Sequence, residues 1–89
     1  MLALQFTDDS GKQLYIMIKD KVTKEDLMKF TVGESRVFTL PNFEKAKSAR
    51  SFAYQIKNQS ETLGWKFSAV IADPIEGSMQ RSIHITRIQ

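Results

Sequence analysis

Apolar and polar residues alternate near the beginning of the chain and predict two β-strands. Residues 2–7 and 14–19 each show this period of two, which is typical of a strand with one buried face. The segment between them, Asp8–Lys12, favours a turn, because Asp and Ser cap their own backbone and Gly accepts a positive φ. We therefore expect the two strands to pair as a hairpin.

A long helix is expected over about residues 43–63. Asn42 stands at its N-cap position, and Gly64 follows its end, where a left-handed conformation is common. The apolar residues of this segment recur at spacings of three, four and seven, so they predict one stripe that packs on a sheet. The stripe consists of Ala49, Phe52, Ala53, Ile56 and Leu63.

The remaining segments predict a shorter helix and three more strands. Thr23 and Asp26 have the spacing of a capping box, with Asp where Glu is more usual, so a short helix is expected over about residues 24–30. Both faces of residues 65–72 are fairly apolar, which predicts a strand in the centre of the sheet. The other two strands are expected at 36–40, ending before Pro41, and at 81–88.

These elements follow one another in the order ββαβαββ. Hairpins at both ends favour an antiparallel or mixed sheet of about five strands, with the long helix across one face. The expected fold is therefore a two-layer α+β domain. The 89 residues are expected to form this single domain, 1–89.

The composition predicts a cytoplasmic protein without a membrane-spanning segment. The sequence has no apolar run near the roughly 20 residues that a membrane span requires. Its first residues lack the basic and long apolar regions of a signal peptide. The absence of cysteine excludes disulfides and fits a reducing compartment.

The net charge of +3 lies entirely in the second half of the chain. Residues 1–43 carry six basic and six acidic residues, whereas residues 44–89 carry seven basic and four acidic ones. A local basic face is a common footprint of a nucleic-acid or acidic-protein partner, although it can also be only a solvated helix face. The candidate nucleic-acid-binding residues on the long helix are Lys47, Arg50, Tyr54 and Lys57, and the strands add Lys66, Arg81 and Arg87.

The sequence predicts neither catalysis, nor a metal site, nor a cofactor. His84 is the only histidine, so a Cys–His pair and a histidine-based zinc cluster are both excluded. The adjacent carboxylates Asp8-Asp9 and Glu25-Asp26 are better explained by a turn and a helix start than by a two-metal site. The four glycines are scattered and form no phosphate-binding loop.

Two nucleic-acid-binding folds fit less well. Gly64–Phe67 has the Gly-aromatic-x-aromatic pattern of an RNA-recognition strand, but the element order differs and these aromatics suit a core. A winged helix would need a preceding two-helix unit and cations at the hairpin tip. The tip expected here, 73–80, has no Lys or Arg.

Four short motifs follow one another between residues 32 and 88. They are Val32-Gly33-Glu34-Ser35, Ala49-Arg50-Ser51 with Ala53, Gly64-Trp65-Lys66-Phe67-Ser68 and Ile85-Thr86-Arg87-Ile88. With these motifs, residues 32–88 resemble a small uncharacterised domain of phage-encoded accessory proteins. The chain departs from that pattern in its fewer basic residues and its acidic loop at 73–76. The resemblance implies a phage or mobile-element origin and no established activity.

Three functional hypotheses remain open. The first is a non-enzymatic accessory protein that binds nucleic acid, with DNA favoured, through the basic face of the long helix. The second is a phage-type protein that binds and inhibits or redirects a host protein, as in anti-defence or regulation, through a sheet edge or the same helix face. The third is a structural or self-associating module, such as a homodimer.

Overall fold

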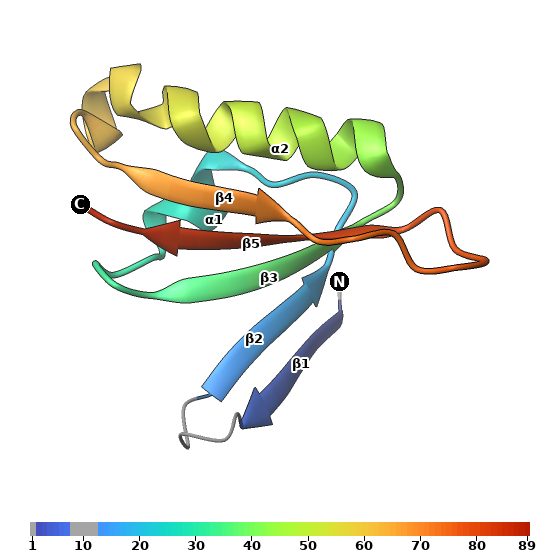
Figure 1. The fold of residues 1–89 in the computed structure, drawn as a ribbon. Coiled ribbons are helices and arrows are strands. Elements are labelled where there is room, and N and C mark those ends of the chain that lie inside the picture. The colour runs from blue at the N-terminus through green and yellow to red at the C-terminus, as the bar shows by residue number, and fades with distance from the viewer. Residues whose placement is uncertain (1, 8–12) are drawn as a thin grey trace.

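The computed structural model describes residues 2–7 and 13–89, and within them five strands form one mixed sheet. The strand order is β1-β2-β3-β5-β4, in which only β2 and β3 run parallel (Figure 1). The α+β class and the long helix are confirmed. The elements are β1 (Leu2–Thr7), β2 (Gln13–Ile18), α1 (Lys24–Met28), β3 (Ser35–Leu40), α2 (Phe43–Gln55), the 3-10 helices η1 (Ile56–Asn58) and η2 (Ser60–Thr62), β4 (Phe67–Ile71) and β5 (Arg81–Arg87).

The first two strands pair antiparallel, as their alternating pattern predicts. Their register joins Leu2 to Ile18 and Thr7 to Gln13. The turn expected at Asp8–Lys12 lies outside the described residues. The chain then passes through α1 and returns as β3, parallel to β2, so α1 forms the crossover between these two strands.

The core lies between the sheet and the helices. α2 lies across one face of the sheet (Figure 1), and its small residues Ala46, Ala49 and Ala53 are buried there. Small side chains allow the helix backbone to approach the sheet closely. Larger side chains from α1, the segment after it and the sheet fill the remaining space: Leu27, Phe30, Phe38, Leu40, Phe67, Ile83 and Ile85.

The long helix is shorter than its apolar pattern predicts. The α-helix ends at Gln55, continues as η1, and is interrupted at Gln59, whose backbone is extended. Thr62, which is fully buried, donates its hydroxyl to the Ile56 carbonyl at 2.5 Å. The prediction that Leu63 faces the core is therefore wrong, since its side chain is 72% exposed. An uninterrupted helix would place Leu63 on the same face as Ile56. The extended backbone at Gln59 breaks the helix, so the side chains after it no longer follow the helical period.

The prediction that residues 65–72 form a central strand is also wrong. β4 ends the sheet, next to β5. Its buried residues, Phe67 and Ala69, contact the core beneath α2, while Val70 on the opposite face is 61% exposed. The apolar residue on the outer face, Val70, is exposed, so apolar residues on both faces did not mean that both faces are buried.

The capping box before α1 is confirmed, although the helix ends at Met28 and not near Phe30. The Thr23 hydroxyl oxygen accepts a hydrogen bond from the Asp26 amide at 3.3 Å, and the Asp26 carboxylate accepts one from the Thr23 amide at 2.9 Å. Each side chain therefore satisfies a backbone donor that the helix itself cannot satisfy.

Replacing Thr23 with alanine should lower the free energy of unfolding by about 1 kcal/mol, because the Asp26 amide loses its acceptor. The conservative variant Thr23→Ser keeps the hydroxyl and should stay close to wild type. Amide hydrogen exchange of residues 25–27 should become faster in Thr23→Ala, and unaltered exchange there would contradict the capping role.

Candidate nucleic-acid interface

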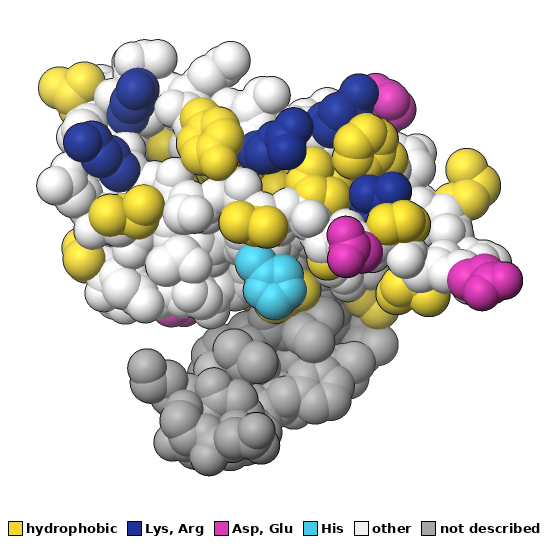
Figure 2. Space-filling model, in the orientation of Figure 1, with side chains coloured by type: hydrophobic (Ala, Val, Ile, Leu, Met, Phe, Trp, Pro, Cys, Tyr) yellow, Lys and Arg dark blue, Asp and Glu magenta, His cyan; other side chains and the backbone are white. Residues whose placement is uncertain are grey.

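One side of α2 carries a row of basic and aromatic side chains. Phe43, Lys47, Arg50, Tyr54 and Lys57 follow one another at spacings of four, three, four and three, so they share one side of the helix and its η1 extension. The three buried alanines lie on the adjoining side, which faces the sheet. Figure 2 shows basic side chains with hydrophobic ones between and beside them along this part of the surface. We call this row the α2 stripe.

Tyr54 connects the α2 stripe to the edge of the sheet. The residue is 48% exposed, yet its hydroxyl donates a hydrogen bond to the Ala69 carbonyl at 3.1 Å. The amides of Lys66 and Ala72 donate to β5 or the residues that follow it. The backbone groups of successive residues in a strand point alternately to its two sides. Ala69 lies three positions from both Lys66 and Ala72, so its backbone groups point away from β5, toward the open edge. Tyr54 is thus exposed and held in place at both ends.

A hollow of about 260 Å³ lies beside Tyr54, at the end of α2. Three aromatic residues, two lysines and one isoleucine line it. Lys57 and Lys66 are both exposed, whereas Trp65 is half-buried and packs against the core. The lining residues are Tyr54, Lys57, Trp65, Lys66, Phe67 and Ile88.

The other end of the α2 stripe is electrostatically mixed. Lys47 lies 3.3 Å from Glu44 and 5.1 Å from the centre of the Phe43 ring. The Arg81 guanidinium lies 4.7 Å from the same ring. The loop that follows β4 adds Asp73 and Glu76, and Figure 2 shows acidic side chains at this end of the surface. The cations without an ion pair to a carboxylate therefore lie at the middle of α2, at Arg50, and near its end, at Lys57 and Lys66.

Arg87 uses its donors inside the protein. Its Nη1 donates to the Phe30 carbonyl and its Nε to the Gln89 carbonyl, each at 3.0 Å. The guanidinium lies only 3.5 Å from the centre of the Trp65 ring. Arg87 therefore packs on Trp65, which lines the hollow, but Arg87 does not line the hollow itself.

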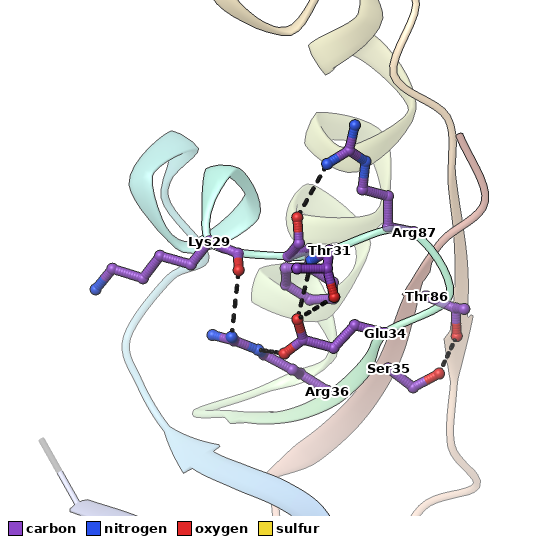
Figure 3. Close-up of polar contacts among 8 residues, drawn as sticks. Lys29, Thr31, Glu34, Ser35, Arg36, Thr86 and Arg87 are labelled. Atoms are coloured by element: carbon purple, nitrogen blue, oxygen red, sulfur yellow. Dashed lines mark hydrogen bonds and ion pairs between the residues drawn. The ribbon is translucent and has the colours of Figure 1, made fainter.

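A polar network next to Arg87 holds the loop between α1 and β3 (Figure 3). The Glu34 carboxylate accepts hydrogen bonds from the Thr31 amide at 2.9 Å and from Arg36 Nε at 2.5 Å. Arg36 also donates to the Lys29 carbonyl at 3.4 Å. Burial raises the pKa of Glu34, but the bonds from Thr31 and Arg36 outweigh this and hold its pKa below the ordinary value. The network ties α1 to the sheet and is structural.

Of the seven candidate residues, the structure brings Tyr54, Lys57 and Lys66 together around the hollow and leaves Arg50 and Lys47 farther along the α2 stripe. Arg81 lies at the opposite, mixed end. The sequence pattern favoured core packing for Trp65. In the structure Trp65 precedes β4, packs partly on the core and also lines the hollow.

His84 and the pair Glu25-Asp26, which the sequence analysis considered for catalysis or metal binding, do not line the hollow. His84 is exposed on β5, and Asp26 is occupied by Lys19 and the capping box. Residues 2–7 and 13–89 contain no group of three or more His, Asp or Glu residues placed to hold a metal ion. Within the same ranges, no helix has the length and apolar character that crossing a membrane requires.

Comparisons of this chain with protein families, curated proteins and solved structures found no match. The resemblance to a phage accessory domain stays a prediction.

Proposed function

We propose that this protein is a small non-enzymatic accessory protein of a phage or mobile element that binds nucleic acid, with DNA favoured, through the α2 stripe and Lys66. The observation that carries the proposal is a set of cations without carboxylate partners. Arg50, Lys57 and Lys66 form no ion pair with any residue in the described part of the chain. They lie beside an exposed and fixed tyrosine ring.

Such cations bind phosphates largely by releasing counterions. The logarithm of the binding constant should fall with the logarithm of the salt concentration, with a slope of about −0.9 for each duplex phosphate neutralised. Three cations therefore correspond to a slope of roughly −2 to −3. Lys47 contributes less in this proposal, because Glu44 already lies beside it.

The test replaces the three cations and measures binding. A variant with Arg50→Gln, Lys57→Gln and Lys66→Gln should keep its fold, because these side chains lie outside the core. Titration of labelled duplex and single-stranded oligonucleotides at about 50 mM and 200 mM salt should show binding at least about tenfold weaker than wild type, with a flatter salt slope.

The matched control removes the same charge from other surfaces. Lys21, Lys29 and Lys45 are exposed and lie outside the α2 stripe. Their triple replacement with Gln should leave most of the affinity intact. An equal loss in both variants would show attraction by net charge alone, and no binding of wild type to either oligonucleotide at low salt would refute the proposal.

A second candidate function is binding to a host protein, and the position of β4 favours it. β4 ends the sheet, and Val70 and Ile71 on it are respectively exposed and half-buried. An extended segment of another protein, or of a second copy of this chain, can add to such an edge. In that case affinity should depend little on salt, and Tyr54→Ala should reduce it more than removal of any single cation.

A further inference from the structure

The α2 stripe and Lys66 combine two features that suit different parts of a nucleotide. Arg50, Lys57 and Lys66 offer positive charge, which suits phosphate. Tyr54 offers an exposed aromatic ring, which suits the face of a base. Base stacking on aromatic side chains and charge attraction to phosphates are the two standard contributions to single-strand binding.

Tyr54 is prepared for stacking before any ligand arrives. An exposed side chain normally loses rotational freedom when it binds a ligand, and this opposes binding. The hydrogen bond from the Tyr54 hydroxyl to the Ala69 carbonyl already restricts the ring, while the residue stays 48% exposed. The ring can therefore accept a base with a small further loss of freedom.

The hollow beside Tyr54 has a size that suits one planar group. Its volume of about 260 Å³ lies just below the roughly 300–1,000 Å³ of pockets that enclose a drug-sized molecule. Trp65 forms part of its wall, and Lys57 and Lys66 lie at its rim. A base in the hollow would thus place its own phosphate near two ammonium groups, which also offset the negative end of the helix dipole of α2.

A duplex cannot use these features together. Its bases are paired and stacked inside the helix, so their faces are closed to Tyr54 and to the hollow. A duplex along the axis of α2 would also meet the acidic end of the surface, where Glu44, Asp73 and Glu76 lie. The loop after β4 projects beyond the beginning of α2 in Figure 1, so these charges extend that end of the surface.

We infer that the ligand of this surface is single-stranded nucleic acid, with one base stacked against Tyr54 at the hollow and its neighbouring phosphates on Arg50, Lys57 and Lys66. The inference rests on the proposed nucleic-acid function and names the substrate class for it. It assigns to Trp65 and the hollow a role that the basic residues alone do not require.

The experiment compares three ligands of equal length: a single-stranded oligonucleotide, the matched duplex, and an abasic single strand that keeps the phosphates but lacks the bases. Trp65 is the only tryptophan in the chain, so intrinsic fluorescence reports directly on the hollow. The single strand with bases should bind about tenfold more tightly than the abasic strand and should quench this fluorescence. The duplex should bind more weakly than the single strand.

Two substitutions at Tyr54 separate the ring from the hydroxyl. Tyr54→Leu removes the ring and should lower affinity for the single strand about tenfold, while affinity for the abasic strand stays unchanged. Tyr54→Phe keeps the ring, loses only the bond to Ala69, and should retain most of the affinity. Circular dichroism and thermal unfolding check that both variants are folded.

The outcomes distinguish the stacking of a single-strand base from nucleic-acid binding in general. Equal affinity for the single strand and the abasic strand, or tighter binding of the duplex, would overturn the stacking inference and leave nucleic-acid binding standing. Absence of binding to all three ligands would overturn the proposed function itself.

Discussion

Replacing Ile56 with alanine should lower the free energy of unfolding by about 2–4 kcal/mol, as expected for a large-to-small substitution in a core. Ile56 is fully buried at the junction of α2 and η1 and belongs to the hydrophobic core. The substitution removes apolar surface from the core and leaves a cavity that the packed sheet beneath it can fill only in part. Urea unfolding followed by circular dichroism measures the change.

Leu63 provides the matched control for this prediction. It belongs to the same apolar pattern in the sequence, but its side chain is 72% exposed. Leu63→Ala should therefore change the free energy of unfolding by no more than about 0.5 kcal/mol. A similar loss in both variants would mean that the helix continues to Leu63, and a loss below about 0.5 kcal/mol for Ile56→Ala would contradict the observed core.

The second large effect is expected at Asp26. This buried carboxylate contacts the Lys19 ammonium at 2.5 Å and accepts hydrogen bonds from the amide and hydroxyl of Thr23. Asp26→Ala leaves the largely buried Lys19 without its partner and removes half of the capping box. We expect a loss of about 2–4 kcal/mol, below the full cost of breaking a completely buried pair because Lys19 can turn toward solvent.

The stability contributed by Asp26 should depend on pH. Burial raises the pKa of this carboxyl, but the bonds from Lys19 and Thr23 outweigh burial, and its pKa is lowered from the ordinary 3.8. The folded protein therefore binds a proton less readily than the unfolded chain. The contribution is fully present above the ordinary pKa and disappears as the pH falls through the lowered value.

Unfolding of wild type and Asp26→Ala at a series of pH values between about 5 and 2 tests this sign. The difference in stability between the two proteins should shrink toward the acid end of that range. Asp20→Ala, at an exposed aspartate six residues earlier, is the control and should follow wild type within about 0.5 kcal/mol throughout. A difference for Asp26→Ala that stays constant or grows as the pH falls would contradict the direction of the pKa shift.

The candidate surface was predictable only where it is local. Lys47, Arg50, Tyr54 and Lys57 lie on one helix, so their spacing alone places them on one side of it. The contribution of each residue was not predictable, because it depends on partners from other elements. Arg87 donates to Phe30, which is 57 residues away, and Tyr54 donates to Ala69 on β4.

The sequence by itself determined those structural features that depend only on residues close together in the chain. These are the strands with their period of two, the capping box at Thr23, the N-cap at Asn42, and the positive φ of Gly64. Each depends on side chains and backbone groups within a few positions, so a short window contains all the interacting partners.

Only the tertiary structure decided the place of each element in the sheet and the point at which α2 ends. β4 lies at the edge because β5 occupies the position between β3 and β4, a choice made by long-range pairing. The helix ends early because Thr62 folds back and donates to the Ile56 carbonyl, so that Thr62 is buried and Leu63 is left outside. The first outcome depends on pairing between strands that are far apart in the sequence, and the second depends on the burial of Thr62 in the folded protein. A periodic pattern along the sequence contains neither.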